Sequence, residues 1–343
     1  MPKVTIDGHT IEVPDGTTIL QAARLIGGAI VPPAMCYHSK LKTSGGYCRT
    51  CIVKVSKGSE KDPRPMPKPV PSCRTTVMDG MEVQNITSPE IIEARAGVVE
   101  FLLLNHPLDC PICDQAGECH LQDLGFQNGK QATRYEFARR QFAQIDIGNY
   151  IKLHMKRCIH CFRCVKLADQ LTPERYHGML FRGDHSEIST YIEKSIDNEF
   201  SGNMVDVCPV GALTDKTFRF KSRVWFTNAM DAHRDCGTTS KNGDVCTGRV
   251  RLWLKGEEVL RVTARKDVYG EVHEFICNTC RFEKKDKKDW TIEGPSAIDR
   301  HSVMSMNHYE TLKTMKLDLA KIKKQLACKK IVLGEGALNP NNQ

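Results

Sequence analysis

The sequence predicts an α+β protein assembled from several small units, and three observations support this. At 343 residues, the chain has the length of two or three domains. Short alternating stretches that indicate strands are interspersed with capped stretches that indicate helices. Eleven of the 16 cysteines, together with one histidine, fall into three successive sets with the spacing of metal ligands. Because metal binding is linked to folding, each set would help to stabilise the small unit around it.

The first unit is predicted to be a small β structure with one helix. Lys3–Ile6 and Thr10–Val13 alternate around an Asp-Gly turn, which predicts a hairpin. A helix follows, capped by Thr17 or Thr18 and ending at Leu25 before two glycines. Further strands are expected at 52–55 and 81–86. Five prolines between positions 63 and 71 predict an extended surface loop with no packed structure of its own.

A helix is predicted from Ser88 to Leu104, because a cap residue, a proline and an acid stand at its start. A third unit covers about 135–220. A fourth unit, about 221–295, should contain strands at Arg249–Leu254 and Val259–Val262 around a Gly256 turn. One more helix is expected at Tyr309–Lys329, within a tail that covers 296–343.

The first ligand set predicts a [2Fe–2S] site. Its members are Cys36, Cys48, Cys51 and Cys73. The long x11 and x21 intervals differ from the two short pairs that closed zinc sites usually present, so iron–sulfur chemistry is favoured. Gly45 and Gly46 would let backbone N–H groups approach the cluster and hydrogen-bond its sulfurs.

The second set predicts a [4Fe–4S] site with one histidine ligand. It comprises His106, Cys110, Cys113 and Cys119. Without the histidine the set is one ligand short, and His120 is the weaker competitor for that role. A neutral imidazole in place of a thiolate changes the charge of the site and therefore its reduction potential.

The third set predicts a second [4Fe–4S] site. Cys158, Cys161 and Cys164 form a Cys-x2-Cys-x2-Cys run, and Cys208, which stands directly before a proline, completes it. In two-cluster ferredoxins the cysteine before the proline serves the other run, so a two-site fold that kept one site is indicated. His160 lies inside the run and is interpreted as a neighbour of the cluster, not a ligand.

A fourth group of cysteines is a candidate metal site of open identity. Its members are Cys236, Cys246, Cys277 and Cys280. Two cysteine-bearing turns that face each other suit either an additional [4Fe–4S] cluster or a structural zinc ion, and four buried thiols with packing roles are the remaining alternative.

Composition excludes several functions. The net charge of +8 is modest, and no interleaved basic and aromatic patch indicates nucleic-acid binding. No apolar run reaches the ~20 residues of a membrane span. The opening residues read as a strand, without a charged stretch followed by an apolar one, so we expect no secretory signal. Free thiolates suit a reducing cytosol. No Gly-rich nucleotide loop is present, so hydride chemistry is expected on a flavin-bearing partner.

The three sets in this order resemble the large iron–sulfur (G) subunit of respiratory NADH:quinone oxidoreductase, complex I. The resemblance covers residues 1–220 and rests on CYHSKLKTSGGYCRTC, NHPLDCPICDQAGECHLQD, RCIHCFRCVK and DVCPVGAL. It implies a β-grasp [2Fe–2S] ferredoxin domain (1–86), a small helical [4Fe–4S] domain (87–134) and a [4Fe–4S] ferredoxin-like domain (135–220). It further implies electron transfer from FMN on an NADH-binding partner toward quinone, among other peripheral-arm subunits, with membrane association only through partners at the cytoplasmic face of the inner membrane.

Beyond residue 220 the resemblance weakens. Residues 221–295 resemble only the start of a molybdopterin-oxidoreductase-like domain, so a short form is expected, with neither pterin nor FMN on this chain. Hydrogenases share the same modules, and a diaphorase subunit of an NAD-linked hydrogenase or formate dehydrogenase is the first alternative. An alternative of another class is a zinc-binding interaction protein.

Overall fold

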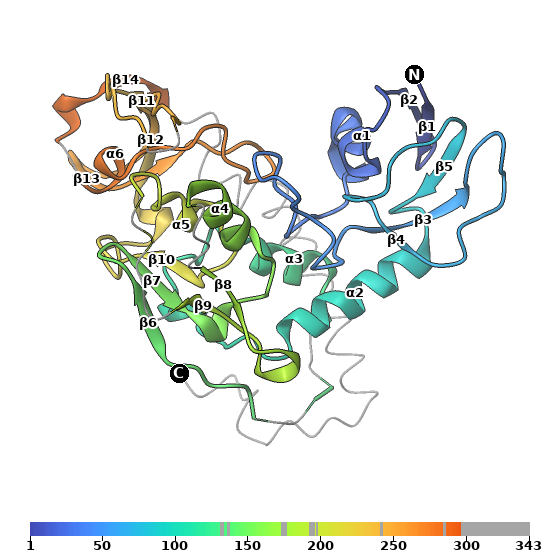
Figure 1. Ribbon diagram of the computed structural model, residues 1–343, viewed down its shortest axis with the longest axis horizontal. Coiled ribbons are helices and arrows are strands. Elements are labelled where there is room, and N and C mark those ends of the chain that lie inside the picture. Colours follow the sequence, from blue (N-terminus) through green and yellow to red (C-terminus); the bar gives the residue numbers. More distant parts are fainter. Residues whose placement is uncertain are drawn as a thin grey trace, which may run out of the picture.

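The computed structural model describes residues 1–130, 134–135, 138–172, 177–191, 196, 198–240, 243–283 and 286–295. The described chain is a mixture of helices and four separate sheets (Figure 1). The N-terminal sheet and the last sheet lie at opposite upper corners of that view, and the helical and third units lie below them. The predicted helix at 309–329 lies outside the described residues.

The first unit is a five-stranded sheet that packs against one helix. Its strands are β1 (Lys3–Ile6), β2 (His9–Glu12), β3 (Ile52–Lys57), β4 (Val70–Pro71) and β5 (Met81–Gln84), in the order β2-β1-β5-β3-β4. The predicted hairpin is confirmed, with Asp7 and Gly8 at positive φ in its turn. Helix α1 (Ile19–Ile26) begins at Thr18, whose side chain and Gln21 form a reciprocal capping box.

The proline-rich loop is more ordered than its composition predicts. Val70 and Pro71 form β4 and pair with the start of β3. The N–H of Met66 donates to the carbonyl of Val55 at 3.0 Å, and Met66 and Val70 pack against the core of the first unit. The expectation of a loop without packed structure is therefore wrong for these residues, because two apolar side chains between the prolines bind it to the sheet.

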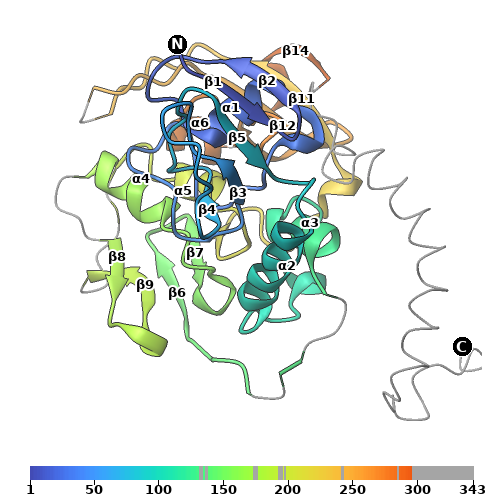
Figure 2. The same ribbon diagram turned by 90° about the vertical axis from the view of Figure 1, so that its right-hand side faces the viewer.

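The second unit is helical. Helix α2 (Pro89–Leu103) and helix α3 (His120–Asn128) pack against each other, and the 3-10 turn η2 (Cys110–Ile112) lies between them in sequence. Figure 2 shows the two helices side by side. The predicted start of α2 is confirmed, although Ser88 makes no side-chain cap bond. Arg95 of α2 donates to the carbonyls of Thr50 and Ile52 at 3.1 and 3.0 Å, and so attaches the helix to the first sheet.

The third unit combines two small sheets with two helices. One sheet has the order β10-β7-β6, and the other pairs β8 with β9. Helices α4 and α5 pack together beside them. The bounds are β6 (Gln144–Ile147), β7 (Ile151–His154), η3 (Met155–Arg157), α4 (Arg163–Leu171), β8 (His177–Leu180), η4 (Gly183–His185), β9 (Glu187–Thr190), α5 (Asn203–Val207) and β10 (Leu213–Asp215).

The fourth unit is an antiparallel sheet of order β13-β12-β11-β14 with one short helix. The bounds are η6 (Val224–Phe226), β11 (Asn228–His233), β12 (Arg249–Lys255), β13 (Glu258–Ala264), α6 (Asn278–Phe282), η7 (Lys287–Asp289) and β14 (Thr291–Pro295). Both predicted strands are confirmed as β12 and β13. One hydrophobic cluster extends from the loop of Cys36 through the second, third and fourth units, so these units share a core.

Candidate metal centres

The first ligand set lies in the loop before β3 and in the segment directly after β4. All four cysteines are buried. The sulfurs of Cys51 and Cys73 lie 3.4 Å apart, and the N–H of Cys48 donates to the sulfur of Cys36 at 3.4 Å. Hydrogen bonds from the neighbouring thiols, first that of Cys48, lower the pKa of Cys36 to about 2. Metal binding replaces the protons of such closely packed thiols and so stabilises the arrangement.

The glycine loop approaches this set as the sequence predicts. The N–H of Gly46 donates to the sulfur of Cys73 at 3.2 Å. A side chain at Gly45, where φ is +98°, would place its Cβ only 3.1 Å from the same sulfur. Both glycines therefore allow the backbone to contact a ligand sulfur, which stabilises the thiolate form.

The second set surrounds the turn between α2 and α3. His106 follows the end of α2, and Cys119 is the residue before α3. The Nδ1 atom of His106 is buried and has no hydrogen-bond partner. Burial lowers the pKa of this imidazole to about 4, so the ring is neutral at pH 7, which is the form that binds metal. An unpartnered, neutral nitrogen fits a metal ligand.

The competitor His120 points elsewhere. Its Nε2 atom lies against Gly270 of the fourth unit, where any side chain on that glycine would collide with the ring. Cys113 lies within electrostatic range of both Cys110 and Cys119, and the charge of Arg157 acts on both His106 and Cys113. His106 therefore stays the predicted histidine ligand of this set.

The third set encloses a small apolar cavity. Its four cysteines line this pocket together with apolar side chains such as Leu153, Ile188 and Leu213. Burial raises the pKa of Cys161 to about 12, which disfavours a bare thiolate there. The structure thus places Cys208 beside the run at 158–164. The ring of His160 contacts the carbonyl of Ser186 at 3.2 Å and is not turned toward the sulfurs.

Two connections between the sets were not found by sequence reasoning. Arg163 lies between two cysteines of the third set, and its Nη2 atom donates to the carbonyls of Ala34 and Tyr37, beside Cys36, at 3.1 and 2.5 Å. An arginine inside the cysteine run was the available signal, but its partners are more than 120 residues away.

The second connection is the segment that follows Cys208. The carbonyl of Pro209 accepts a hydrogen bond from the N–H of His120 at 3.2 Å and lies 4.0 Å from the sulfur of Cys119. Gly211 leaves room for the sulfur of Cys113, because a Cβ on this glycine would overlap that sulfur. The short segment from Cys208 to Gly211 therefore connects the third set to the second in space.

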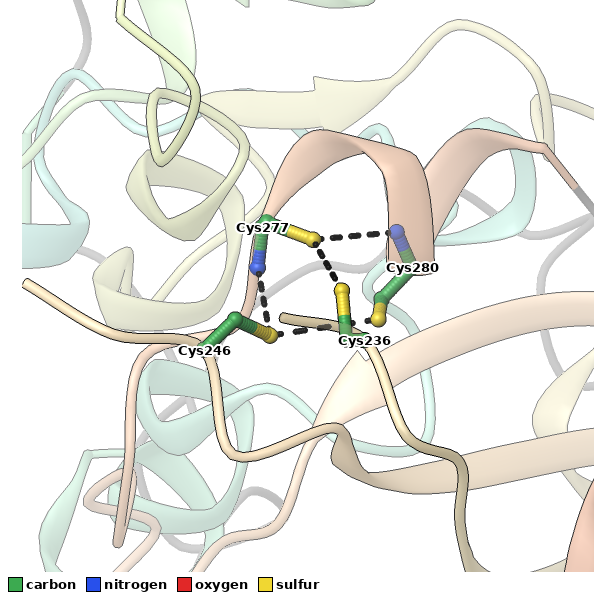
Figure 3. Close-up of side chains that lie close together, drawn as sticks. All are labelled: Cys236, Cys246, Cys277 and Cys280. Atoms are coloured by element: carbon green, nitrogen blue, oxygen red, sulfur yellow. Dashed lines mark hydrogen bonds between the residues drawn. The ribbon is translucent and has the colours of Figure 1, made fainter. Parts of the chain in front are cut away.

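The fourth group is assembled by two elements of the fourth unit. Cys236 and Cys246 come from the loop between β11 and β12, whereas Cys277 precedes α6 and Cys280 lies in it. Figure 3 shows the four side chains converging. All four sulfurs lie within 4.8 Å of one another. Two cysteine-bearing segments do face each other, as the sequence predicts.

In the part of the chain that the structure describes, no helix is both long and apolar enough to cross a bilayer.

Three family models match successive parts of the chain. "2Fe-2S iron-sulfur cluster binding domain" matches residues 2–88, "NADH-ubiquinone oxidoreductase-G iron-sulfur binding region" matches residues 95–134, and "NADH-quinone oxidoreductase subunit 3, ferredoxin-like domain" matches residues 148–214. Each matched range contains one complete ligand set of the three predicted from spacing.

Curated relatives agree with these matches. The chain is 39% identical over 94% of its length to the G subunit of NADH-quinone oxidoreductase from Rickettsia bellii strain RML369-C, covering 44% of that protein. It is 37% identical over 99% of its length to the protein of the same name from Rickettsia conorii strain Malish 7, covering 47%. "NADH dehydrogenase [ubiquinone] iron-sulfur protein 1, mitochondrial" of Solanum tuberosum is 43% identical over 82% of the chain and is covered to 35%. The chain thus spans less than half the length of these relatives.

Among solved structures, a chain of an NAD+-reducing [NiFe]-hydrogenase in the H2-reduced state superimposes with a TM-score of 0.54. The match covers 65% of this chain and 91% of that one at 24% identity. At this identity the likeness shows a shared fold.

Proposed function

This chain belongs to the family of the large iron–sulfur (G) subunit of NADH-quinone oxidoreductase, and from that premise we propose that it is an electron-transfer subunit of such an enzyme. One observation carries the proposal: each family model covers one ligand set, and the members of each set are consistent with a cluster site. The sets would hold one [2Fe–2S] and two [4Fe–4S] clusters, in the assignment predicted from spacing. Such clusters supply one-electron oxidation and reduction.

The chain's own residues prepare these sites. Thiolates must form in a buried setting, and hydrogen bonds such as that from the N–H of Gly46 to Cys73 favour them. The neutral imidazole of His106 removes one negative charge from the second set. Apolar walls around the third set exclude water. Burial, hydrogen bonds and ligand charge are the quantities that set a reduction potential.

We further propose that the third set lies between the other two in space. Arg163 connects it to the loop of the first set, and the segment from Cys208 to Gly211 connects it to the second. The spatial order is then first, third, second, which differs from the order in the sequence. Magnetic coupling between reduced sites, seen as broadened EPR signals, should involve the third set with each neighbour.

The partners follow from the same premise. The proposed partners are an FMN- and NADH-binding subunit and other peripheral-arm subunits, with association at the cytoplasmic face of the inner membrane through them. Neither FMN nor molybdopterin is assigned to this chain. The proposed domains are 1–86, 87–134, 135–220 and 221–295, followed by the tail at 296–343.

The alternative as a diaphorase subunit of a hydrogenase or formate dehydrogenase is supported by the shared modules and by a fold likeness at 24% identity. Co-purification distinguishes the two: quinone-reducing membrane subunits support our proposal, whereas a nickel or molybdenum subunit contradicts it. The alternative as a zinc-binding interaction protein is tested by analysing the metal content of the purified chain.

The decisive experiment is anaerobic purification of the full chain with iron and sulfide analysis and EPR. Three clusters require about ten irons per chain, counting two or four per cluster. A colourless protein whose only metal is zinc would refute the redox function.

A pair of histidine variants then tests the ligand assignment. His106→Cys should retain the second cluster but lower its potential, because a thiolate replaces a neutral ring. His120→Gln, beside Cys119, is the matched control and should leave the potential unchanged. If both variants leave it unchanged, His106 is not a ligand.

A further inference from the structure

The four cysteines of the fourth group are packed more tightly than those of the other groups. The sulfurs of Cys236 and Cys277 lie 3.3 Å apart, and those of Cys246 and Cys280 lie 3.8 Å apart. All four sulfurs lie within 4.8 Å of one another. Among the described residues, no other set of three or more cysteine, histidine or acidic ligand atoms is this compact.

This spacing fits one metal ion and not a cluster. Four thiolates around a zinc ion at about 2.3 Å form a tetrahedron whose neighbouring sulfurs lie roughly 3.8 Å apart. In a [4Fe–4S] cluster each thiolate binds a different iron, so the body of the cluster separates the sulfurs. The four cysteines of the third set line one apolar pocket but do not form a group as compact as the fourth.

The surroundings stabilise four thiolates at this point. Backbone N–H groups donate to two of the sulfurs at 3.3 Å: that of Cys280 to Cys277, and that of Cys277 to Cys246. The guanidinium of Arg234 donates to the sulfur of Cys280 at 3.3 Å. These donors and the arginine charge offset the negative charge of a four-thiolate site, as neighbouring groups do around bound metals.

From this geometry we propose that Cys236, Cys246, Cys277 and Cys280 bind one structural zinc ion. Zinc suits the site because four thiolates fill a tetrahedral shell and leave no open position for a reaction. Figure 3 shows that the ligands come from a loop and from the first turn of a helix. The ion would therefore attach the loop between β11 and β12 to α6.

The attachment extends to the third ligand set. Asn278 of α6 accepts a hydrogen bond from the N–H of Gly202 at 2.9 Å, and its amide donates to the carbonyl of Asn198 at 3.1 Å. Arg281 of α6 pairs with Asp206 at 2.6 Å. Gly202 and Asp206 belong to the segment of α5, which ends directly before Cys208. The zinc ion would hold α6 against the helix that presents Cys208.

The test is metal analysis of the full chain, purified anaerobically with its clusters. We expect one zinc ion beside about ten irons per chain. The double variant Cys246→Ser/Cys280→Ser should lose the zinc and retain the irons at low temperature. On warming, the EPR signal of its third set should disappear at a lower temperature than that of the unmodified chain. Cys328→Ser is the matched control, because Cys328 stands outside all four groups in the sequence.

A second measurement applies if the double variant does not fold. Growth with cobalt should place Co²⁺ in the intact site and give the strong visible bands of a tetrahedral thiolate complex. About fourteen irons without zinc would overturn the proposal in favour of a fourth cluster. One extra iron with no zinc, or four metal-free thiols or disulfides, would overturn it as well. Zinc found without iron clusters would refute the electron-transfer function but would still support the zinc site.

Discussion

Replacing Asp206 by asparagine tests how strongly the fourth unit supports the helix that presents Cys208. The Asp206 carboxylate accepts a hydrogen bond from Arg281 at 2.6 Å and another from the N–H of Ala264 at 2.8 Å. Burial raises the pKa of Asp206, but the charge and hydrogen bond of Arg281 more than reverse this, so the net pKa is lowered. The pair is therefore ionised at pH 7, and each side chain is only 2% exposed.

The burial of an ion pair determines how much stability is lost when one partner is removed. Removing one partner of a buried ion pair leaves an uncompensated charge and costs about 3–5 kcal/mol. An exposed pair contributes about 0–1 kcal/mol, because water solvates both groups. Asp146 and Lys216 form such a pair at 2.9 Å, with side chains 47% and 32% exposed. Asp146→Asn, which removes the same charge at a similar distance, is therefore the matched control.

The assay is urea unfolding of the cluster-loaded chain, followed by loss of the EPR signal of the third set. With a slope of about 3 kcal/mol per molar urea, Asp206→Asn should lower the midpoint by about 1 M or more. Asp146→Asn should shift the urea midpoint by at most a few tenths of 1 M. The double variant Asp206→Leu/Arg281→Met should recover most of the loss, because it leaves no buried charge. Equal shifts for the two asparagine variants would refute the reasoning.

Three further outcomes are expected. Gly211→Ala should deplete the EPR signal of the second cluster, because the new Cβ overlaps the sulfur of Cys113; Gly178→Ala, in open space, should not. His177→Phe should remove a pH dependence of the free energy of unfolding. Burial lowers the pKa of this 1%-exposed histidine to about 4, so the contribution of the neutral ring to stability is present above pH 6.5. In the unmodified chain the free energy of unfolding should be lower by about 1.4 kcal/mol at pH 5.5 and should fall further toward pH 4. A urea midpoint for His177→Phe with unchanged pH dependence contradicts this. Gly97→Ala, within α2 and facing open space, should raise the free energy of unfolding by about 1 kcal/mol, and a lower melting temperature would contradict it.

Features set by neighbouring residues were predictable from the sequence. The first hairpin and the cap of α1 depend on a few adjacent residues, Asp7, Gly8 and Thr18, and all three adopt the expected roles. The strands of the fourth sheet that flank Gly256 were also found, because alternation and a turn residue coincide. The position of Cys208 beside the third run was predictable for another reason, since a cysteine before a proline is a recognised ligand pattern.

Features set by distant residues were not predictable. Strand β11 is mixed in composition and half-buried, and only its pairing with β12 and β14 explains it. The contact between Arg163 and Tyr37 joins positions 126 residues apart. The compactness of the fourth group depends on the approach of a loop to α6, and spacing alone left its metal open. Sequence identifies thiols that can bind metal, whereas the distances between their sulfurs depend on the tertiary structure.

Buried or half-buried arginines are the common means by which the four units are held together. In each case the guanidinium comes from one unit and its acceptor from another: Arg24 with Glu271, Arg157 with Asp109, Arg163 with Tyr37, Arg261 with Glu118, and Arg281 with Asp206. A guanidinium stays charged when buried and donates in a fixed planar geometry, so it fixes orientation better than apolar contact would. Thiolate-rich sites are negative, and a nearby cation favours both the thiolate and the added electron. The same arginines that place the ligand sets relative to one another therefore also adjust the charge around them. Because Arg163 is 1% exposed and lies between two sets, its loss should shift the potentials of both sets toward more negative values.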